Sequence, residues 1–203
     1  GAQDVELIEE SMAAAIGAGL PVFDATGSMI VDIGGGTCDV AVISLGGIAA
    51  SRSIKVGGDA FDEAIVNHMK RAHNLLIGKN TAEDIKLKIG SAEEYDGEGA
   101  MDVKGRNLTD GLPKSVEITS SEIREVLSEP ISKIIASIRE TLEVTLPELA
   151  ADIIDRGIYV AGGSSQLRGL PELIAKETKI QVHIPERPLD CVALGTSAKL
   201  RRA

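Results

Sequence analysis

Three short apolar runs joined by glycine turns constrain the fold of this chain more than any other feature of the sequence. Residues 28–32, 38–44 and 48–56 have the length and the apolar or alternating pattern of β-strands. The glycines at 34–36 lie between the first two runs, and those at 46–47 lie between the second and the third. Because turns this short join antiparallel neighbours, the pattern predicts a three-stranded meander with a glycine loop at its first corner.

The sequence before and after the meander shows helical periodicity and further short apolar runs. Asp59 and Thr81 are expected to cap the helices that follow them, and Thr119 opens a long amphipathic helix. Residues 60–120 are expected to form a small α+β insertion. The expected helices span residues 5–18, 60–74, 82–89, 119–142, 147–156, 170–177 and 191–200, and the later expected strands span 100–104, 115–118, 158–161 and 181–184.

The loop Asp32-Ile33-Gly34-Gly35-Gly36-Thr37 has the composition of an anion site. Glycines at a β-turn let backbone N–H groups crowd an anion, where any Cβ would hold a phosphate away. Asp32 stands at a strand end beside the turn, in a position to hold a hydrated divalent cation. The structural alternative is a glycine-rich hairpin with a capping aspartate.

Two other glycine segments stand at the start of expected helices. Gly162-Gly163-Ser164 follows the strand at 158–161, and helix N-termini preceded by glycines attract anions or let a flat ring approach the backbone. Gly57-Gly58-Asp59 leads into the helix at 60–74 in the same manner. An ordinary loop between a strand and a helix is the alternative for the first of them.

Charged side chains on two expected helices add candidates for the same site. Glu83 and Lys86 are three residues apart and share a helix face, so they can present an acceptor and a donor to a ribose and a base. A solvated ion pair between them is the alternative. Glu10, on the first helix, can orient or deprotonate an attacking water if it faces a phosphate. Here the alternative is a surface acid.

Several classes of protein are excluded or disfavoured. The net charge of −10 argues against a nucleic-acid surface, yet it leaves ATP open because backbone N–H groups need little positive charge to bind phosphate. The sequence contains no Gly-x-x-x-x-Gly-Lys-Ser/Thr loop, which excludes a Walker-type NTPase. The three histidines, His68, His73 and His183, match neither a zinc motif nor a catalytic triad, and are expected in the surface or the core.

The chain is expected to be cytoplasmic. Cys38 and Cys191 match no metal-ligand spacing and are expected to be reduced, mostly buried thiols. Residues 1–4 lack the basic start of a signal peptide, and the longest apolar run, residues 12–23, is about half a membrane span. Contact with a membrane is not expected.

Taken in order, these segments resemble domain II, the C-terminal half, of the MreB family of bacterial actin-like ATPases. The resemblance covers nearly the whole chain and is carried by residues 7–17, 32–37, 57–62, 83–86, 148–153, 158–170 and 190–195. It implies an α/β fold of the RNase H-like, actin-like ATPase type. Residues 1–59 and 121–203 would form subdomain IIA, and residues 60–120 would form the inserted subdomain IIB.

The resemblance also implies a role for each candidate residue, with ATP or ADP and Mg²⁺ as cofactors. Glu10 would position the hydrolytic water, and Asp32 would bind Mg²⁺ through water. The segment from Gly34 through Gly35 and Gly36 to Thr37 would lie at the phosphates. The residues implied for the adenosine side are Gly57, Gly58, Asp59, Glu83, Lys86, Gly162, Gly163 and Ser164.

Three departures from the family pattern shape the expected function. The sequence lacks the family's N-terminal domain, with its second phosphate loop and its membrane-binding surface. Ser11 stands where the family usually has proline, and Ser164-Ser165 replaces the usual glycine and alanine. We therefore expect a nucleotide-binding half-domain of an MreB-type filament ATPase, with weak ATP binding and negligible hydrolysis by itself. The alternative is an engineered or ancestral-like half that self-associates as an assembly module without nucleotide.

Overall fold

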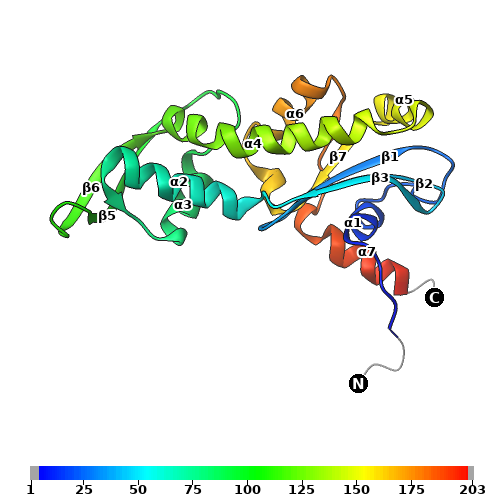
Figure 1. Ribbon diagram of the computed structural model, residues 1–203, viewed down its shortest axis with the longest axis horizontal. Helices are drawn as coiled ribbons and strands as arrows, with labels where there is room; N and C mark the ends of the chain where they lie inside the picture. The colour runs from blue at the N-terminus through cyan, green and yellow to red at the C-terminus, as the bar shows by residue number, and fades with distance from the viewer. Residues whose placement is uncertain (1–4, 201–203) are drawn as a thin grey trace.

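The computed structural model describes residues 5–200 and has two lobes, each built on its own β-sheet (Figure 1). Residues 1–4, on which the expectation of no signal peptide rests, lie outside the described residues. Within residues 5–200, no helix combines the length and the apolar character needed to cross a membrane.

The larger sheet contains the predicted meander. Its five strands lie in the order β3 (Gly47–Ile54), β2 (Cys38–Ser44), β1 (Ser28–Ile33), β7 (Ile158–Ala161) and β8 (Val182–His183). The strands β1, β2 and β3 pair antiparallel, as the short turns require, whereas β7 pairs parallel to β1 and β8 parallel to β7. The ends of β1 and β7 therefore meet at one edge of the sheet, where their two glycine loops follow.

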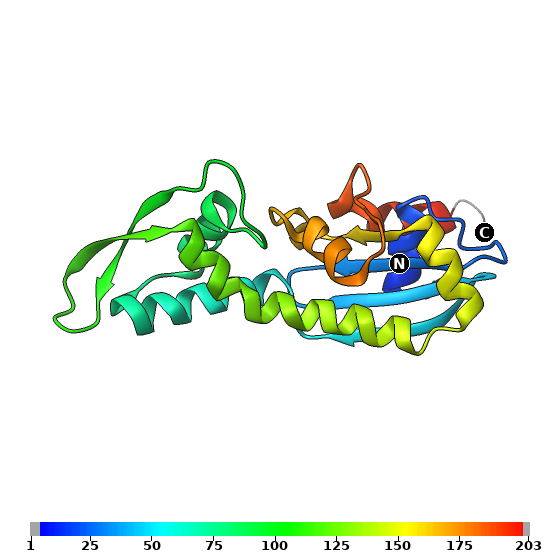
Figure 2. The ribbon, with the colours of Figure 1, turned by 90° about the horizontal axis from the view of Figure 1, so that it is seen from above.

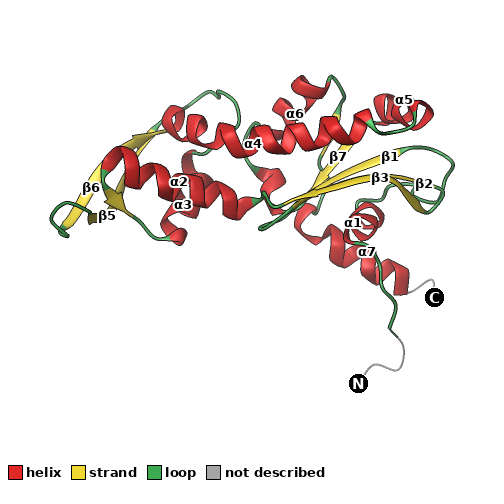
Figure 3. Cartoon of the chain, in the orientation of Figure 1, coloured by secondary structure: helices red, strands yellow, loops and turns green. Residues whose placement is uncertain are grey.

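Helices cover both faces of the larger sheet (Figures 1 and 3). On one face lie α1 (Glu10–Gly17) and α7 (Cys191–Leu200), and on the other lie α4 (Ser120–Glu143), α5 (Pro147–Arg156) and α6 (Leu170–Thr178). Strand β1 is buried along its whole length, and its side chains alternate between the two layers: Ile30 packs with α1 and α7, and Val31 packs with α4.

The smaller lobe is an α+β unit whose sheet has the order β4 (Leu75–Leu76), β5 (Ala100–Asn107) and β6 (Pro113–Thr119). Against it lie α2 (Gly58–His73) and α3 (Lys79–Ile89). Helix α4 begins in this lobe and continues along the larger sheet (Figure 2), so that one helix spans both lobes. Two short 3₁₀ helices, η1 (Gly163–Gln166) and η2 (Pro188–Asp190), follow β7 and precede α7.

Three helix starts differ from the sequence prediction. Helix α1 begins at Glu10 rather than at residue 5, because the apolar side chains ahead of it face solvent: Val5 is 79% and Leu7 is 91% exposed. The predicted caps Asp59 and Thr81 are wrong. Helix α2 begins two residues earlier than predicted and α3 three residues earlier, with Gly57 and Gly78 as N-caps and no side-chain cap bond at either.

Candidate functional site

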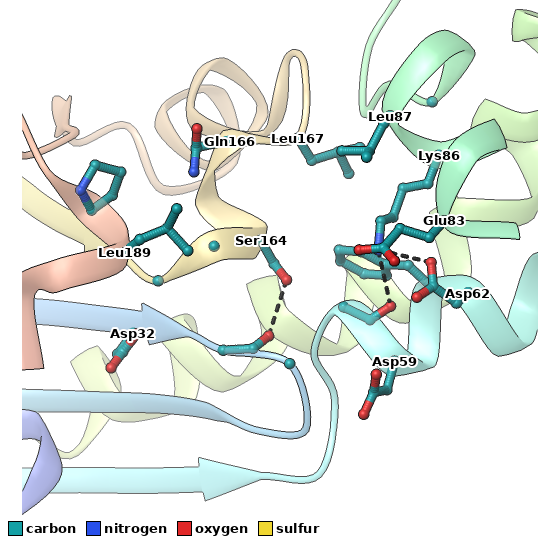
Figure 4. A pocket seen from close by; sticks show the side chains of 18 of the residues that line it. Asp32, Asp59, Asp62, Glu83, Lys86, Leu87, Ser164, Gln166, Leu167 and Leu189 are labelled. Carbon is teal, nitrogen blue, oxygen red and sulfur yellow. Dashed lines mark hydrogen bonds and ion pairs between the residues drawn. The ribbon is translucent and has the colours of Figure 1, made fainter. Parts of the chain in front are cut away.

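A cavity of about 740 Å³ opens where the end of β1, the turn η1 and the helices α2 and α3 meet (Figure 4). Segments that are far apart in the sequence converge here. The predicted site residues that line the cavity are Glu10, Asp32, Gly34, Gly35, Gly58, Asp59, Glu83, Lys86, Gly162, Gly163 and Ser164. Gly36, Thr37 and Gly57 stand beside lining residues without lining the cavity themselves.

The glycine loop between β1 and β2 presents free backbone N–H groups. Only the Gly34 N–H is used within the turn, where it donates to the Thr37 carbonyl over 2.9 Å. In the part of the chain that the structure describes, the N–H groups of Gly35, Gly36 and Thr37 have no acceptor. A Cβ built at Gly35 or Gly36 would meet no atom of the chain within 4 Å. Nothing in the fold itself therefore demands glycine at these two positions.

The carbonyl groups of the same loop hold it in place. The Gly34 carbonyl accepts from the Gly58 N–H and from the Ser164 hydroxyl, each at 3.0 Å, and the Gly35 carbonyl accepts from the Asp59 N–H at 2.8 Å. A Cβ at Gly57 would lie 2.6 Å from both carbonyl oxygens. Gly57 is therefore needed for the close packing of α2 against the loop. These bonds occupy the carbonyls within the fold and leave the N–H groups of the loop available.

Asp32 is a buried carboxylate without a partner. Its residue is 7% exposed, and among residues 5–200 no donor or cation pairs with its side chain. Burial, followed by the nearby charges of Glu10 and Asp39, raises the pKa of Asp32 to about 6. A buried acid that the chain leaves unpaired is costly to the fold. Such groups mark positions where a ligand or an ion completes the site.

The loop after β7 lies directly against the glycine loop. Gly162 has a φ of +83°, and a Cβ there would lie 2.3 Å from the Ile33 carbonyl oxygen and 2.5 Å from Asp32 Oδ1. Only glycine fits both the conformation and the space. The hydroxyl of Ser164 then reaches the Gly34 carbonyl, so the two loops form one continuous wall (Figure 4).

Lys86 is held in a buried ion pair on the side of the cavity formed by α3. Its ammonium lies 2.7 Å from Asp62 Oδ1, outside hydrogen-bond geometry, and donates to the Gly58 carbonyl at 3.4 Å. The two side chains are 13% and 4% exposed. A solvated pair between Lys86 and Glu83 is therefore wrong: the partner of Lys86 is on α2, and Glu83 remains exposed (Figure 4).

Glu10 and Asp59, the other two predicted acids, also line the cavity, and both are exposed. Glu10 stands at the start of α1 and is close enough to Asp32 to raise the pKa of its carboxyl. Asp59 pairs with Lys79 at 2.6 Å. The lysine, by hydrogen bond and by charge, holds the pKa of Asp59 below its usual range.

Sequence reasoning missed part of the cavity wall. Asp62 was within reach of prediction, since it stands four residues after Gly58 and so shares a helix face with it. The remaining missed residues come from loops and from side chains that give no local signal. They are Phe61, Leu87, Gly90, Gln166, Leu167, Arg168, Pro188, Leu189 and Val192.

Comparisons with known proteins agree on one family. A family model described as MreB/Mbl protein matches residues 1–203. The cell shape-determining protein MreB of Escherichia coli is 53% identical over 195 residues, which are 96% of this chain and 56% of that protein. The cell shape-determining protein Mbl of Bacillus subtilis is 47% identical over 200 residues, 98% of this chain and 60% of that protein. The chain thus spans little more than half the length of these relatives.

Solved structures give the same result for the fold. Crystal structures of MreB5 of Spiroplasma citri bound to ADP and to AMPPNP superimpose with a TM-score of 0.96 at 42% identity, covering 100% of this chain and 61% of theirs. The predicted α/β fold of the actin-like, RNase H-like type is confirmed.

Proposed function

Because the chain belongs to the MreB/Mbl protein family, we propose that it supplies one side of the nucleotide cleft of an MreB-type cell-shape protein. The observation that carries the proposal is the glycine loop. Among the described residues, three adjacent N–H groups without an acceptor begin at Gly35, which lines the cavity, beside an unpaired buried carboxylate. Backbone N–H groups crowded in this manner bind phosphate, and the carboxylate suits a hydrated divalent cation. The relatives solved with ADP and AMPPNP support ATP or ADP as the ligand.

In this proposal, each wall of the cavity binds a different part of the nucleotide. Gly35, Gly36 and Thr37 hold the β- and γ-phosphates through their N–H groups, and Gly34 keeps the loop in position. Asp32 holds Mg²⁺ through water. The unpaired state of this carboxylate fits that role, because a bound cation would offset the cost of its ionisation. Glu10 positions the attacking water.

The adenosine side is formed by the second loop and by the smaller lobe. Gly162, Gly163 and Ser164 lie beneath the nucleoside, where the first two carry no side chain. Glu83 and Lys86 hold the ribose and the edge of the adenine. Glu83 is exposed at the cavity, and Lys86 is held by Asp62 in a fixed position, which would reduce the entropy lost on binding.

We assign the chain to domain II of the family. Residues 1–59 and 121–203 form subdomain IIA, and residues 60–120 form subdomain IIB, in keeping with the two sheets. Only one phosphate loop is present in these residues. Each charge-assisted bond that a second loop would add is worth about 1.5–3 kcal/mol, and about 1.4 kcal/mol changes affinity tenfold. These 203 residues alone therefore bind ATP in the micromolar to millimolar range and hydrolyse it negligibly.

Calorimetric titration of the chain with ATP and Mg²⁺ tests this proposal. We expect weak binding that Gly35→Val abolishes, because its side chain occupies the space of the phosphate. Gly99→Val is the matched control: Gly99 is equally exposed, and a Cβ there also meets no atom within 4 Å. Nanomolar binding by the parent chain, or unchanged binding by the Gly35 variant, would refute the proposal.

Self-association is a second candidate function, favoured by aliphatic side chains at the far end of the larger lobe. Val144, Leu146 and Ile154 are between 62% and 70% exposed around α5 (Figure 1). We expect sedimentation of the chain to show concentration-dependent assembly that Ile154→Glu reduces and that Leu112→Glu, on the smaller lobe, does not. Assembly unaffected by nucleotide and by Asp32→Ala would favour an assembly module over a nucleotide switch, and a strict monomer in all conditions would exclude both.

The cysteines and the net charge bear on the location and the partners of the protein. Cys38 and Cys191 are free, buried thiols, in keeping with a cytoplasmic location. With a net charge of −10, neither nucleic acid nor an anionic membrane surface is a partner of this domain.

A further inference from the structure

Two histidines and a glutamate meet in the smaller lobe, away from the nucleotide cavity. The Nε2 atoms of His68 and His73 lie 2.5 and 2.6 Å from the same oxygen, Glu122 Oε1. One ligand atom from each residue falls within 4.8 Å of the others. The proposed nucleotide site uses none of these side chains.

The geometry of two helices brings the three side chains together. His68 and His73 lie in the last part of α2, and Glu122 lies in the first turn of α4. Thr119 caps α4 by accepting from the Glu122 N–H at 3.2 Å. In a capping box the side chain of such a glutamate reaches back to the N–H of the cap. Here its carboxylate is bonded to the two imidazoles, which makes the cluster more than a by-product of capping.

Within residues 5–200, the two imidazoles are the only partners of the Glu122 carboxylate. Among the described residues, no lysine or arginine forms an ion pair with Glu122. The imidazoles donate their Nε2 protons to this one oxygen. When these protons move to Nδ1, or leave for solvent from a charged imidazole, a cation would find two neutral nitrogens and one carboxylate.

We propose that His68, His73 and Glu122 form a binding site for Zn²⁺, with water as the fourth ligand. Two imidazoles and a carboxylate are a recurring set of protein ligands for an open zinc site, and nitrogen ligands disfavour Mg²⁺ and Ca²⁺. The three side chains are 23% to 26% exposed, so the site is partly shielded yet open to an ion and to water.

The helix ends favour this arrangement. The C-terminus of α2 carries the negative end of its helix dipole and attracts a cation, and the N-terminus of α4 favours the carboxylate. Lys70 and Arg71 in the last turn of α2 oppose the ion. Arg71 also faces an acid: the pKa of Glu129 is lowered by the hydrogen bond and charge of Lys133 and, to a smaller extent, by the charge of Arg71. A bound ion would fasten the end of α2 to the start of α4.

Titration of the tag-free chain with Co²⁺, followed by displacement with Zn²⁺, tests the proposal. Co²⁺ reports a tetrahedral nitrogen and oxygen site by its visible absorption. We expect one Co²⁺ per chain, displaced by Zn²⁺ and unaffected by excess Mg²⁺. His73→Asn and Glu122→Gln should each weaken binding at least about tenfold, since even indirect partners of a metal ligand change affinity by about 10–100-fold. His183→Asn is the matched control and should bind like the parent chain.

Three results would overturn the proposal: no absorption on adding Co²⁺, equal loss in the His183 variant, or parental affinity in both cluster variants. Far-UV circular dichroism establishes that the variants are folded. X-ray absorption at the zinc edge of the parent chain gives an answer that depends on no variant. Two imidazoles on the metal support the site, and one or none contradict it.

Discussion

Replacing Asp32 by asparagine should stabilise the nucleotide-free chain at neutral pH. Burial and the charges of Glu10 and Asp39 raise the pKa of Asp32 from 3.8 to about 6. At 1.36 kcal/mol for each unit of pKa, this difference corresponds to about 3 kcal/mol. Below pH 3.8 the acid is protonated in both the folded and the unfolded state, so the raised pKa does not reduce the free energy of unfolding. As the pH rises to about 6, the acid ionises in the unfolded state first, and the folded state loses this stability. Asparagine is neutral throughout and avoids the loss.

Thermal unfolding at a series of pH values measures the effect. For a chain of this size, about 3 kcal/mol corresponds to a rise in Tm of roughly 6–12 °C at pH 7. The gain should shrink as the pH falls from 6 and should vanish below about 4. Asp102→Asn, at an exposed position on β5, is the control and should change stability by less than about 0.5 kcal/mol. An Asp32→Asn gain that is absent at pH 7, or equally large at pH 4, would refute the reasoning.

Three further experiments test the separate roles of two glycines and of the buried ion pair. Gly36→Ala should leave the free energy of unfolding in urea within about 0.5 kcal/mol of the parent while ATP affinity falls in calorimetry, because its Cβ meets no atom of the fold within 4 Å and would stand among the N–H groups assigned to the phosphates. Gly162→Ala should cost more than about 2 kcal/mol in urea unfolding, from a positive φ and a contact of 2.3 Å with Ile33; a smaller cost contradicts the packing argument. Lys86→Met should cost about 3–5 kcal/mol by leaving Asp62 buried and unpaired, and adding Asp62→Leu should restore most of that stability; equal stability of the single and double variants would contradict it.

The order and antiparallel pairing of the first three strands could be predicted because their cause is local, whereas the parallel pairing of β7 and β8 was not predicted. The meander needs only alternating side chains and turns too short for a crossover, and β1 to β3 match the predicted runs closely. The ends of the helices depend on distant parts of the chain. Gly57 rather than Asp59 caps α2, since the carbonyls of Gly34 and Gly35 approach it so closely that no side chain fits.

The charged partners in the site were less predictable than the glycines. Helical spacing placed Glu83 and Lys86 on one helix face, and both line the cavity. The alternative of an ion pair between them is wrong, because Lys86 pairs with Asp62 on another helix, 24 residues earlier in the sequence. The histidine cluster could not be predicted for the same reason, because its members come from distant parts of the sequence. His68 and His73 match no spacing motif, and only the packing of α2 beside α4 brings Glu122 to them.

Amide NMR of the chain during titration with ATP and Mg²⁺ tests the central claim most directly, because it observes the N–H groups themselves. We predict that the largest shifts occur at Gly35, Gly36 and Thr37, with smaller ones at Gly163 and Ser164 and none at Ile154 on α5. If the N–H signals of Gly35, Gly36 and Thr37 stay in place while ATP binds, or if millimolar ATP shifts no signal at all, this loop is not a phosphate site.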